Sequence, residues 1–221
     1  ILLHLHLTPR FFFHCDKVQW EYCLLMQDSS QKLLLKQVIN GIHPIPETDF
    51  EAFYQLFKPF SAKRKEILTY AGNVEKHLYF VIDGLQRMYY LDEQNREATI
   101  IFSYTCNFGG VLDSMMQKNP SKFYYETLTP STFLRANFQQ IESLIENHPE
   151  IEIVLRKGLT LAFSGVLDRL VELQCFSSEE KFRQLLNRSP HILQIVPHKY
   201  LANYIGIDAS NFSKLLNSIK L

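Results

Sequence analysis

The stretch YLANYIGIDASNFSKLLNSI, residues 200–219, has the spacing of two short helices joined by a sharp turn. Small and aliphatic residues recur at helical spacing up to Gly206, and a second apolar stripe begins at Phe212. Gly206 can adopt the left-handed conformation that such a turn requires, and Asp208 is suited to cap the second helix. The stretch therefore predicts a helix-turn-helix. The alternative is an ordinary helical hairpin at the end of a globular domain.

The charge of this end differs from that of the rest of the chain. Over 221 residues, 23 Lys and Arg balance 23 Asp and Glu, and the composition, 46% hydrophobic and 21% charged, is that of a folded protein. After residue 180 six cations face one anion (+6 − 1 = +5), so residues 1–180 carry −5. The residues counted are Lys181, Arg183, Arg188, Lys199, Lys214 and Lys220 against Asp208. A basic module on an acidic body is expected if only this end contacts phosphate.

The middle of the chain has the pattern of a β-domain. Short runs rich in β-branched and aromatic residues are separated by turn residues at spacings of roughly 8–12 residues, which is typical of an antiparallel sandwich or jelly roll. The runs are EILTYAG (66–72), HLYFVIDG (77–84), LQRMYYLD (85–92), EATIIFSY (97–104), FYYETL (123–128) and STFLRAN (131–137). Asp83-Gly84 is expected to form a tight hairpin, and residues 92–95 a second turn.

Helical patterns flank this β-domain, and the one after it is long. Residues 151–174 contain no proline and carry an apolar stripe in steps of three and four. The stripe is Leu155, Leu159, Ala162, Val166, Leu170 and Leu173. We expect it to form the seam of a parallel homodimer. The alternative is that it covers the jelly roll.

The segment between the long helix and the helix-turn-helix contains its own signals. Ser177 to Glu180 reads SSEE and predicts a capping box at the start of another helix, which Pro190 ends. Residues 191–198 are expected to form a short extended link.

The order of these elements resembles the Crp/Fnr superfamily of bacterial transcription regulators. HLYFVIDGLQRMYYLD (77–92) and VPHKYLANYIGIDASNFSKLL (196–216) are the most similar segments. The resemblance implies an α+β fold with a cyclic-nucleotide-binding-type antiparallel β-roll (jelly roll), a long dimerisation helix and a C-terminal (winged) helix-turn-helix. The implied divisions are 1–28, a poorly defined N-terminal extension; 29–137, the β-roll sensor domain; 138–176, the dimerisation helix; and 177–221, the DNA-binding domain.

The segment that binds the ligand in this family departs from its pattern. FGGVLDSMMQKNPSKFYYETL (108–128) has a glycine where the cyclic-nucleotide binders have glutamate, and it lacks their arginine. Lys122 offers a point charge instead of a planar fork, so we expect cyclic AMP to bind weakly or not at all. The candidate ligand residues are Gly109, Gly110, Lys122, Phe123 and Tyr124. The alternative is that the aromatic residues are core residues of a strand, and the effector is unknown.

By the same resemblance, the second helix of the helix-turn-helix reads DNA. The candidate DNA-binding residues are Lys199, Ala209, Ser210, Asn211, Ser213, Lys214 and Asn217. We expect Lys214 to read a guanine, and Lys199 to contact phosphate. The sequence thus predicts a homodimeric, sequence-specific transcription regulator whose partners are double-stranded DNA, RNA polymerase and an unidentified small molecule. The alternative is a ligand- or protein-binding module whose C-terminal helices do not bind DNA.

Other classes of protein lack a signature. Four cysteines occur without a CxxC or any His/Cys ligand spacing, so we expect no metal or iron–sulfur site, no disulfide framework, and a cytoplasmic location. His77 is a lone candidate for a haem ligand, and such a histidine is usually exposed or hydrogen-bonded. No nucleophile–base pair or paired carboxylates indicate an enzyme. The apolar run at the start of the chain is too short and too polar to span a membrane.

Overall fold

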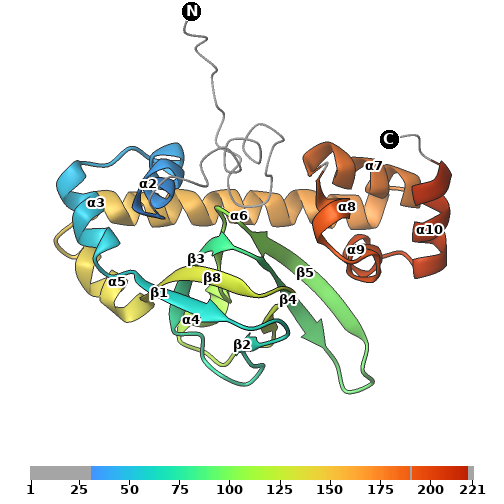
Figure 1. Cartoon of the computed structure of the whole chain (residues 1–221), viewed down its shortest axis with the longest axis horizontal. Helices are drawn as coiled ribbons and strands as arrows, with labels where there is room; N and C mark the ends of the chain where they lie inside the picture. Colours follow the sequence, from blue (N-terminus) through green and yellow to red (C-terminus); the bar gives the residue numbers. More distant parts are fainter. Residues whose placement is uncertain (1–30, 190, 219–221) are drawn as a thin grey trace, which may run out of the picture.

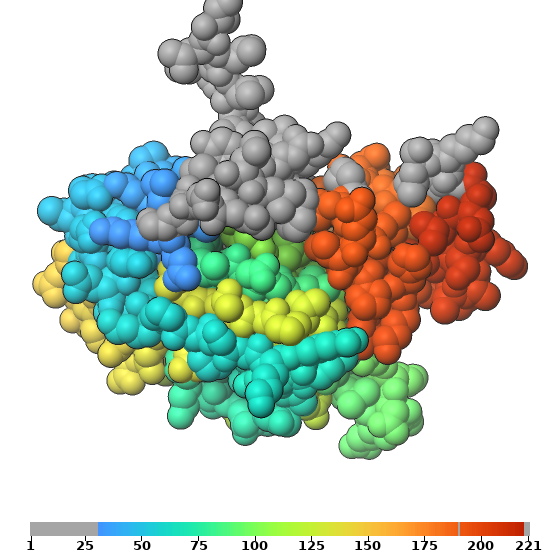
Figure 2. Space-filling view, in the orientation of Figure 1, coloured from blue at the N-terminus to red at the C-terminus, as the bar shows by residue number. Residues whose placement is uncertain are grey.

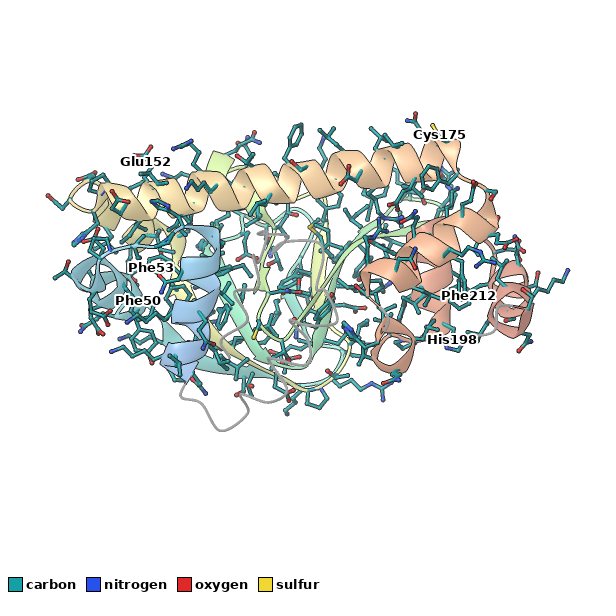
Figure 3. All side chains as sticks on the ribbon, turned by 90° about the horizontal axis from the view of Figure 1, so that it is seen from above. Phe50, Phe53, Glu152, Cys175, His198 and Phe212 are labelled. Atoms are coloured by element: carbon teal, nitrogen blue, oxygen red, sulfur yellow. The ribbon has the colours of Figure 1, made fainter. Side chains whose placement is uncertain are left out.

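The computed structural model of the chain describes residues 31–189 and 191–218. A two-sheet β-roll lies beside the long helix α6, with helices α2, α3 and α5 near one end of α6 and α7 to α10 near the other (Figure 1). Seen from above, α6 runs along one edge of the molecule (Figure 3). The expectation for residues 1–28 lies outside the described residues.

The element bounds agree with most of the predicted segments. The helices are α2 (Gln31–Ile42), α3 (Glu47–Tyr54), α4 (Leu112–Gln117), α5 (Phe138–Ile145), α6 (Pro149–Cys175), α7 (Ser178–Arg188), α8 (Ile192–Ile195), α9 (His198–Ile205) and α10 (Ala209–Ser218). The strands are β1 (Lys58–Ala62), β2 (Ile67–Thr69), β3 (His77–Asp83), β4 (Leu85–Leu91), β5 (Glu97–Tyr104), β6 (Phe108–Gly109), β7 (Tyr124–Thr127) and β8 (Ser131–Asn137). Each of the six predicted runs contains a strand.

The two sheets are antiparallel and enclose an aromatic core. Their strand orders are β1-β8-β3-β6 and β2-β7-β4-β5. Tyr79, Tyr125 and Phe133 pack between the sheets and are 2% exposed or less. On the other face of the first sheet, Phe80 packs into a second core with α2, α3, α5 and α6. The predicted jelly roll with flanking helices is therefore confirmed.

The expected hairpin at Asp83-Gly84 is wrong. β3 pairs with β8 and β6, whereas β4 pairs with β5 and β7, so the chain passes here from one sheet to the other. Gly84 has φ +102°, and a Cβ at this position would overlap Ser131. The second expected turn does join β4 to β5, where Asp92 N donates to Arg96 O at 3.1 Å.

Two strands lacked a sequence signal. β1 begins with Lys58-Pro59, and proline is tolerated there because β1 is at the edge of its sheet. β6 has only two residues. Neither run is long or apolar enough to be recognised by alternation.

The segment after α6 confirms one expectation and overturns another. Ser177 and Glu180 form the predicted capping box of α7. The expected extended link at residues 191–198 contains the short helix α8, because Ile192 and Val196 both turn into the core of the C-terminal helices. Val196 N donates to Ile192 O at 2.9 Å.

Two further properties concern cysteines and membranes. The expectation of no disulfide framework is wrong at Cys106, which is disulfide-bonded, whereas Cys175 is free and exposed. None of the helices in the described part of the chain is both long and apolar enough to cross a bilayer. From residue 138 to 218 the described residues form helices and no strand, so they do not include the β-wing of the expected winged helix-turn-helix.

Candidate nucleic-acid interface

The helix-turn-helix is built as its sequence predicts. Gly206 ends α9 in the left-handed conformation with φ +67°, and Ile207 N donates back to Ala202 O at 3.0 Å. Asp208 Oδ1 accepts a hydrogen bond from Asn211 N at 2.7 Å, so this carboxylate caps α10. Phe212, labelled in Figure 3, is 1% exposed. Its ring packs edge-on against Phe182 of α7, with ring centroids 5.2 Å apart. The buried Phe212 sets which face of α10 remains free.

The free face of α10 carries most of the candidate DNA-binding residues. Exposed side chains follow the helical spacing i, i+3, i+4 and i+7, and they are Ser210, Ser213, Lys214 and Asn217, with Ala209 beside them. Asn211 is different, since it is half-buried and its Nδ2 donates to Ser178 Oγ at 3.2 Å. The structure therefore brings five of the six α10 candidates onto one surface and turns Asn211 toward α7. Lys199 is exposed on α9.

The positive charge of this end is smaller than the sequence count suggests. Arg183 pairs with Glu179 at 2.8 Å, and Arg188 forms a two-point ion pair with the carboxylate of Glu172 on α6. Within the described residues, Lys199 and Lys214 form no ion pair with a carboxylate. These two lysines carry the unpaired charge of the helix-turn-helix itself.

The helix-turn-helix is docked on the outer face of the β-roll. The orange helices of this end lie against the β-roll (Figure 2), and α9 contacts β5, whereas α10 packs on α7 and α9. Asn203 of α9 accepts from Thr99 N at 2.5 Å and donates to Glu97 O at 2.6 Å, so its carboxamide pairs with the edge of β5. This pairing satisfies two backbone groups that an edge strand would otherwise leave open.

A charged cluster on the β-roll holds Tyr200 of α9. The guanidinium of Arg87, 3% exposed, lies 4.0 Å from the ring centroid of Tyr200 and bonds to Glu97 and Glu126. Lys65 Nζ donates to the Tyr200 hydroxyl at 2.7 Å. Burial alone would raise the pKa of the Tyr200 phenol, but the Lys65 hydrogen bond and the Arg87 charge outweigh it and lower this pKa. α9 is thus fixed by polar contacts as well as by packing.

A cavity of about 350 Å³ lies between the β-roll and α6. Its walls are mostly apolar and include Met88, Ile101, Phe108, Leu159 and Phe163. The part of the lining that the structure describes includes one carboxylate, Asp113, and no cationic side chain. The described residues hold no group of three His, Cys, Asp or Glu side chains that could bind a metal ion.

Tyr125 contributes a buried hydroxyl to the wall of this cavity. The side chain is 1% exposed, burial raises the pKa of its phenol, and its hydroxyl forms no well-aligned hydrogen bond among the described residues, although Ser103 is close. A Cβ at Gly109 would overlap this hydroxyl, so glycine is required there. A ligand with a hydrogen-bond acceptor could satisfy the phenol.

Two of the five predicted ligand residues line the cavity, and the other three do not. Gly109 and Gly110 line the cavity. Lys122 is exposed elsewhere, Phe123 packs against the core of the roll, and Tyr124 stacks on Tyr89 with ring centroids 5.1 Å apart. Strand alternation explains the outcome, because Tyr125 faces inward when Tyr124 faces outward. This period of two was the signal that could have identified Tyr125.

The predicted stripe of α6 has two environments. Leu155, Leu159 and Ala162 face the helices and the β-roll, so the first half covers the body of the same chain. The second half is partly open to solvent, with Val166, Leu170 and Leu173 exposed by 43%, 48% and 39%, although Val166 and Phe163 also border the cavity. Phe163, Leu167 and Val171 join this open surface and were absent from the predicted stripe. We call these six residues of the second half the α6 seam.

Known proteins resemble the chain in sequence and in fold. No protein-family model matches it. It is 22% identical over 138 residues to the global nitrogen regulator of Nostoc sp., a match that covers 62% of this chain and 56% of that protein. The global nitrogen regulator of Synechocystis sp. is 22% identical over 169 residues, covering 71% and 75%. The chain thus aligns with little more than half of the first of these relatives.

Solved structures identify the fold. FixK2 from Bradyrhizobium japonicum superposes with a TM-score of 0.66 at 14% identity, over 73% of this chain and 83% of that one. A protein of the Crp/Fnr family from Eubacterium rectale gives 0.61 at 14% identity, over 78% and 82%. The chain therefore has the fold of the Crp/Fnr regulators, and the resemblance predicted from its sequence is confirmed.

Proposed function

We propose that the protein is a homodimeric, sequence-specific DNA-binding transcription regulator that acts in the cytoplasm, with double-stranded DNA and RNA polymerase as partners. The observation that carries this proposal is the free polar face of α10 within a capped helix-turn-helix. A helix presented in this way fits the major groove of DNA, where side chains can reach base edges. The similarity to global nitrogen regulators supports the same class of function.

Lys214 and Asn217 are the proposed base-reading residues. Both are exposed and lie on the same face as Ser210 and Ser213, and Lys214 has no carboxylate partner among the described residues. A lysine can donate to guanine O6 or N7, and an asparagine can pair with adenine. Lys199, on α9, is assigned to phosphate. Asn211 takes a supporting role, because its amide already donates to Ser178.

The α6 seam is the proposed dimer interface. An open apolar strip of six large side chains on one helix is more than solvent-exposed surfaces usually tolerate. A two-fold pair of α6 helices would cover it and would place two copies of α10 on one side of the dimer. The binding site on DNA should then be a near-palindrome with half-sites about 34 Å apart.

The cavity beside Tyr125 is the proposed effector site. Its described lining residues include one carboxylate and no cationic side chain, so it suits an uncharged, largely apolar molecule that accepts a hydrogen bond. A cyclic phosphate would be poorly compensated there. Calorimetry should therefore detect no cyclic-AMP binding, and micromolar affinity would contradict this assignment.

A shift assay with genomic fragments tests DNA binding itself. The parent protein should retard a subset of fragments at nanomolar concentration in moderate salt. Because Lys199 and Lys214 are the lysines without a carboxylate partner in the described part of the helix-turn-helix, the loss of affinity with salt should be modest. Uniform, weak retardation of all fragments would favour the module that does not read DNA.

A further inference from the structure

A polar hollow of about 430 Å³ lies at the end of the β-roll, away from the residues assigned above. It is bounded by β1, β3, β8 and α5 and by the turn that precedes β1. Its polar lining consists of Lys58, His77 and Arg135 together with the carboxamides of Gln55, Asn137 and Gln140. The volume is within the range of small-ligand pockets, roughly 300–1,000 Å³.

Strand register brings the basic side chains together. Lys58 of β1 and Tyr79 of β3 are both paired with Arg135 of the central strand β8. His77 of β3 is paired with Asn137, two residues further along β8. Directly paired residues lie on the same face of a sheet with Cβ atoms about 4.5–5.5 Å apart. The three basic groups therefore converge on one surface, although they are far apart in the sequence.

The charge of the hollow is not balanced by carboxylates. Among the described residues no acidic side chain lines it, and neither Lys58 nor Arg135 forms an ion pair. The guanidinium of Arg135 lies 3.9 Å from the ring centroid of Phe60, which supports its face. One of its N–H groups donates to the Tyr79 hydroxyl, and the other donors of the fork remain for a ligand. Lys58 Nζ donates to Gln55 O at 3.0 Å and has further donors.

The one carboxylate near His77 is committed elsewhere. Glu75 lies 3.9 Å from His77 Nδ1, but it is 4% exposed and accepts hydrogen bonds from the backbone of Lys76 and His77. Lys76 is exposed and adds a further positive charge close to the hollow. The hollow therefore has a local excess of positive charge in a protein whose net charge is zero.

We propose that this hollow binds a small oxyanion, a molecule that carries a carboxylate or a phosphate group. Arg135 would hold two oxygens through its planar fork, Lys58 would supply a point charge, and the carboxamides would orient the rest of the ligand. The concave shape favours a small molecule over an acidic segment of another protein, which would need a broader surface. This site complements the uncharged cavity beside Tyr125, so the β-roll offers two pockets of opposite chemistry.

Titration calorimetry of the full chain, with succinate and inorganic phosphate as separate probes, tests the proposal. At least one probe should bind saturably at one site, and the stronger of the two identifies the class of oxyanion. Arg135→Gln should weaken binding by tenfold or more, whereas Arg135→Lys should weaken it less. Lys63→Gln is the matched control, because it removes an exposed positive charge beyond the other end of β1, and it should bind like the parent.

Two results would overturn the proposal. One is the absence of saturable binding of either probe at millimolar concentration by a parent protein with an intact thermal transition. The other is tighter binding of an oligoglutamate peptide than of both probes with the same dependence on Arg135, which would make the hollow a protein-docking surface. An Arg135→Lys variant that folds normally excludes loss of structure as the cause of weakened binding.

Discussion

Val166→Glu should convert the dimer into a monomer. Val166 is 43% exposed within the α6 seam, and Phe163 and Leu170 lie on either side of it at helical spacing. In a two-fold pair of α6 helices each substitution places a carboxylate against apolar side chains, and the symmetry makes two such sites per dimer. Each dimer therefore contains two substituted positions, and both oppose dimerisation.

The magnitude follows from the exposed surface. The open parts of the six α6-seam side chains amount to about 1,000 Å² of apolar area per dimer, or roughly 25 kcal/mol before costs, as an upper limit. Association costs about 4–15 kcal/mol of this gain. An unpaired buried carboxylate costs about 3–5 kcal/mol. Two of them would remove at least about 6 kcal/mol, which is a factor of about 10⁴ in the dissociation constant.

Sedimentation velocity across a range of protein concentrations measures this change directly. The parent should sediment as a dimer at micromolar concentration, and Val166→Glu as a monomer with an unchanged far-ultraviolet spectrum. Ser143→Glu is the matched control, since it adds the same carboxylate at an exposed helical position on α5, outside the α6 seam. An undisturbed Val166→Glu dimer would show that the seam is not the interface.

The remaining predictions concern the docking of α9 and the titration of the half-buried His77. Asn203→Ala leaves two backbone groups of β5 unpaired, so it should lower the free energy of unfolding by roughly 1–3 kcal/mol. Urea titrations measure this change, with Asn119→Ala at an exposed position as the control. An effect of Asn203→Ala no larger than that of the control would contradict the docked arrangement. Burial, followed by the charges of Arg135 and Lys76, lowers the pKa of His77, so the folded protein binds fewer protons than the unfolded chain and its stability should fall as the pH drops below about 6.5. His77→Gln should reduce that fall between pH 7.5 and 5.5, and an unchanged slope would exclude His77 as a contributor.

The fold could be predicted largely because local signals agree with the tertiary structure. Gly206 and Asp208 mark the turn and the cap of the helix-turn-helix, and both act as expected. The strands were recognisable from alternation and composition. The pairing of strands was less accessible, since Asp83-Gly84 has the residues of a hairpin but lies where the chain crosses between sheets.

The sites were harder to predict because they depend on contacts between distant segments. The α6 stripe is continuous in sequence, but only the fold shows that Leu155 faces the body of the chain and Leu170 does not. The docking of Tyr200 on Arg87 joins residues that no local pattern connects. The same is true of Lys58 and Arg135, which meet only through the register of β1 with β8.

Selection of binding sequences from a random DNA library tests the central claim most directly. The parent dimer should enrich a near-palindrome with half-sites about one helical turn apart. Lys214→Ala should lose roughly 1–3 kcal/mol per half-site and relax one base position, whereas Lys199→Ala should keep the consensus and weaken all sequences alike. If the parent enriches no sequence, or if Lys214→Ala returns the parent consensus unchanged, α10 does not read DNA through Lys214.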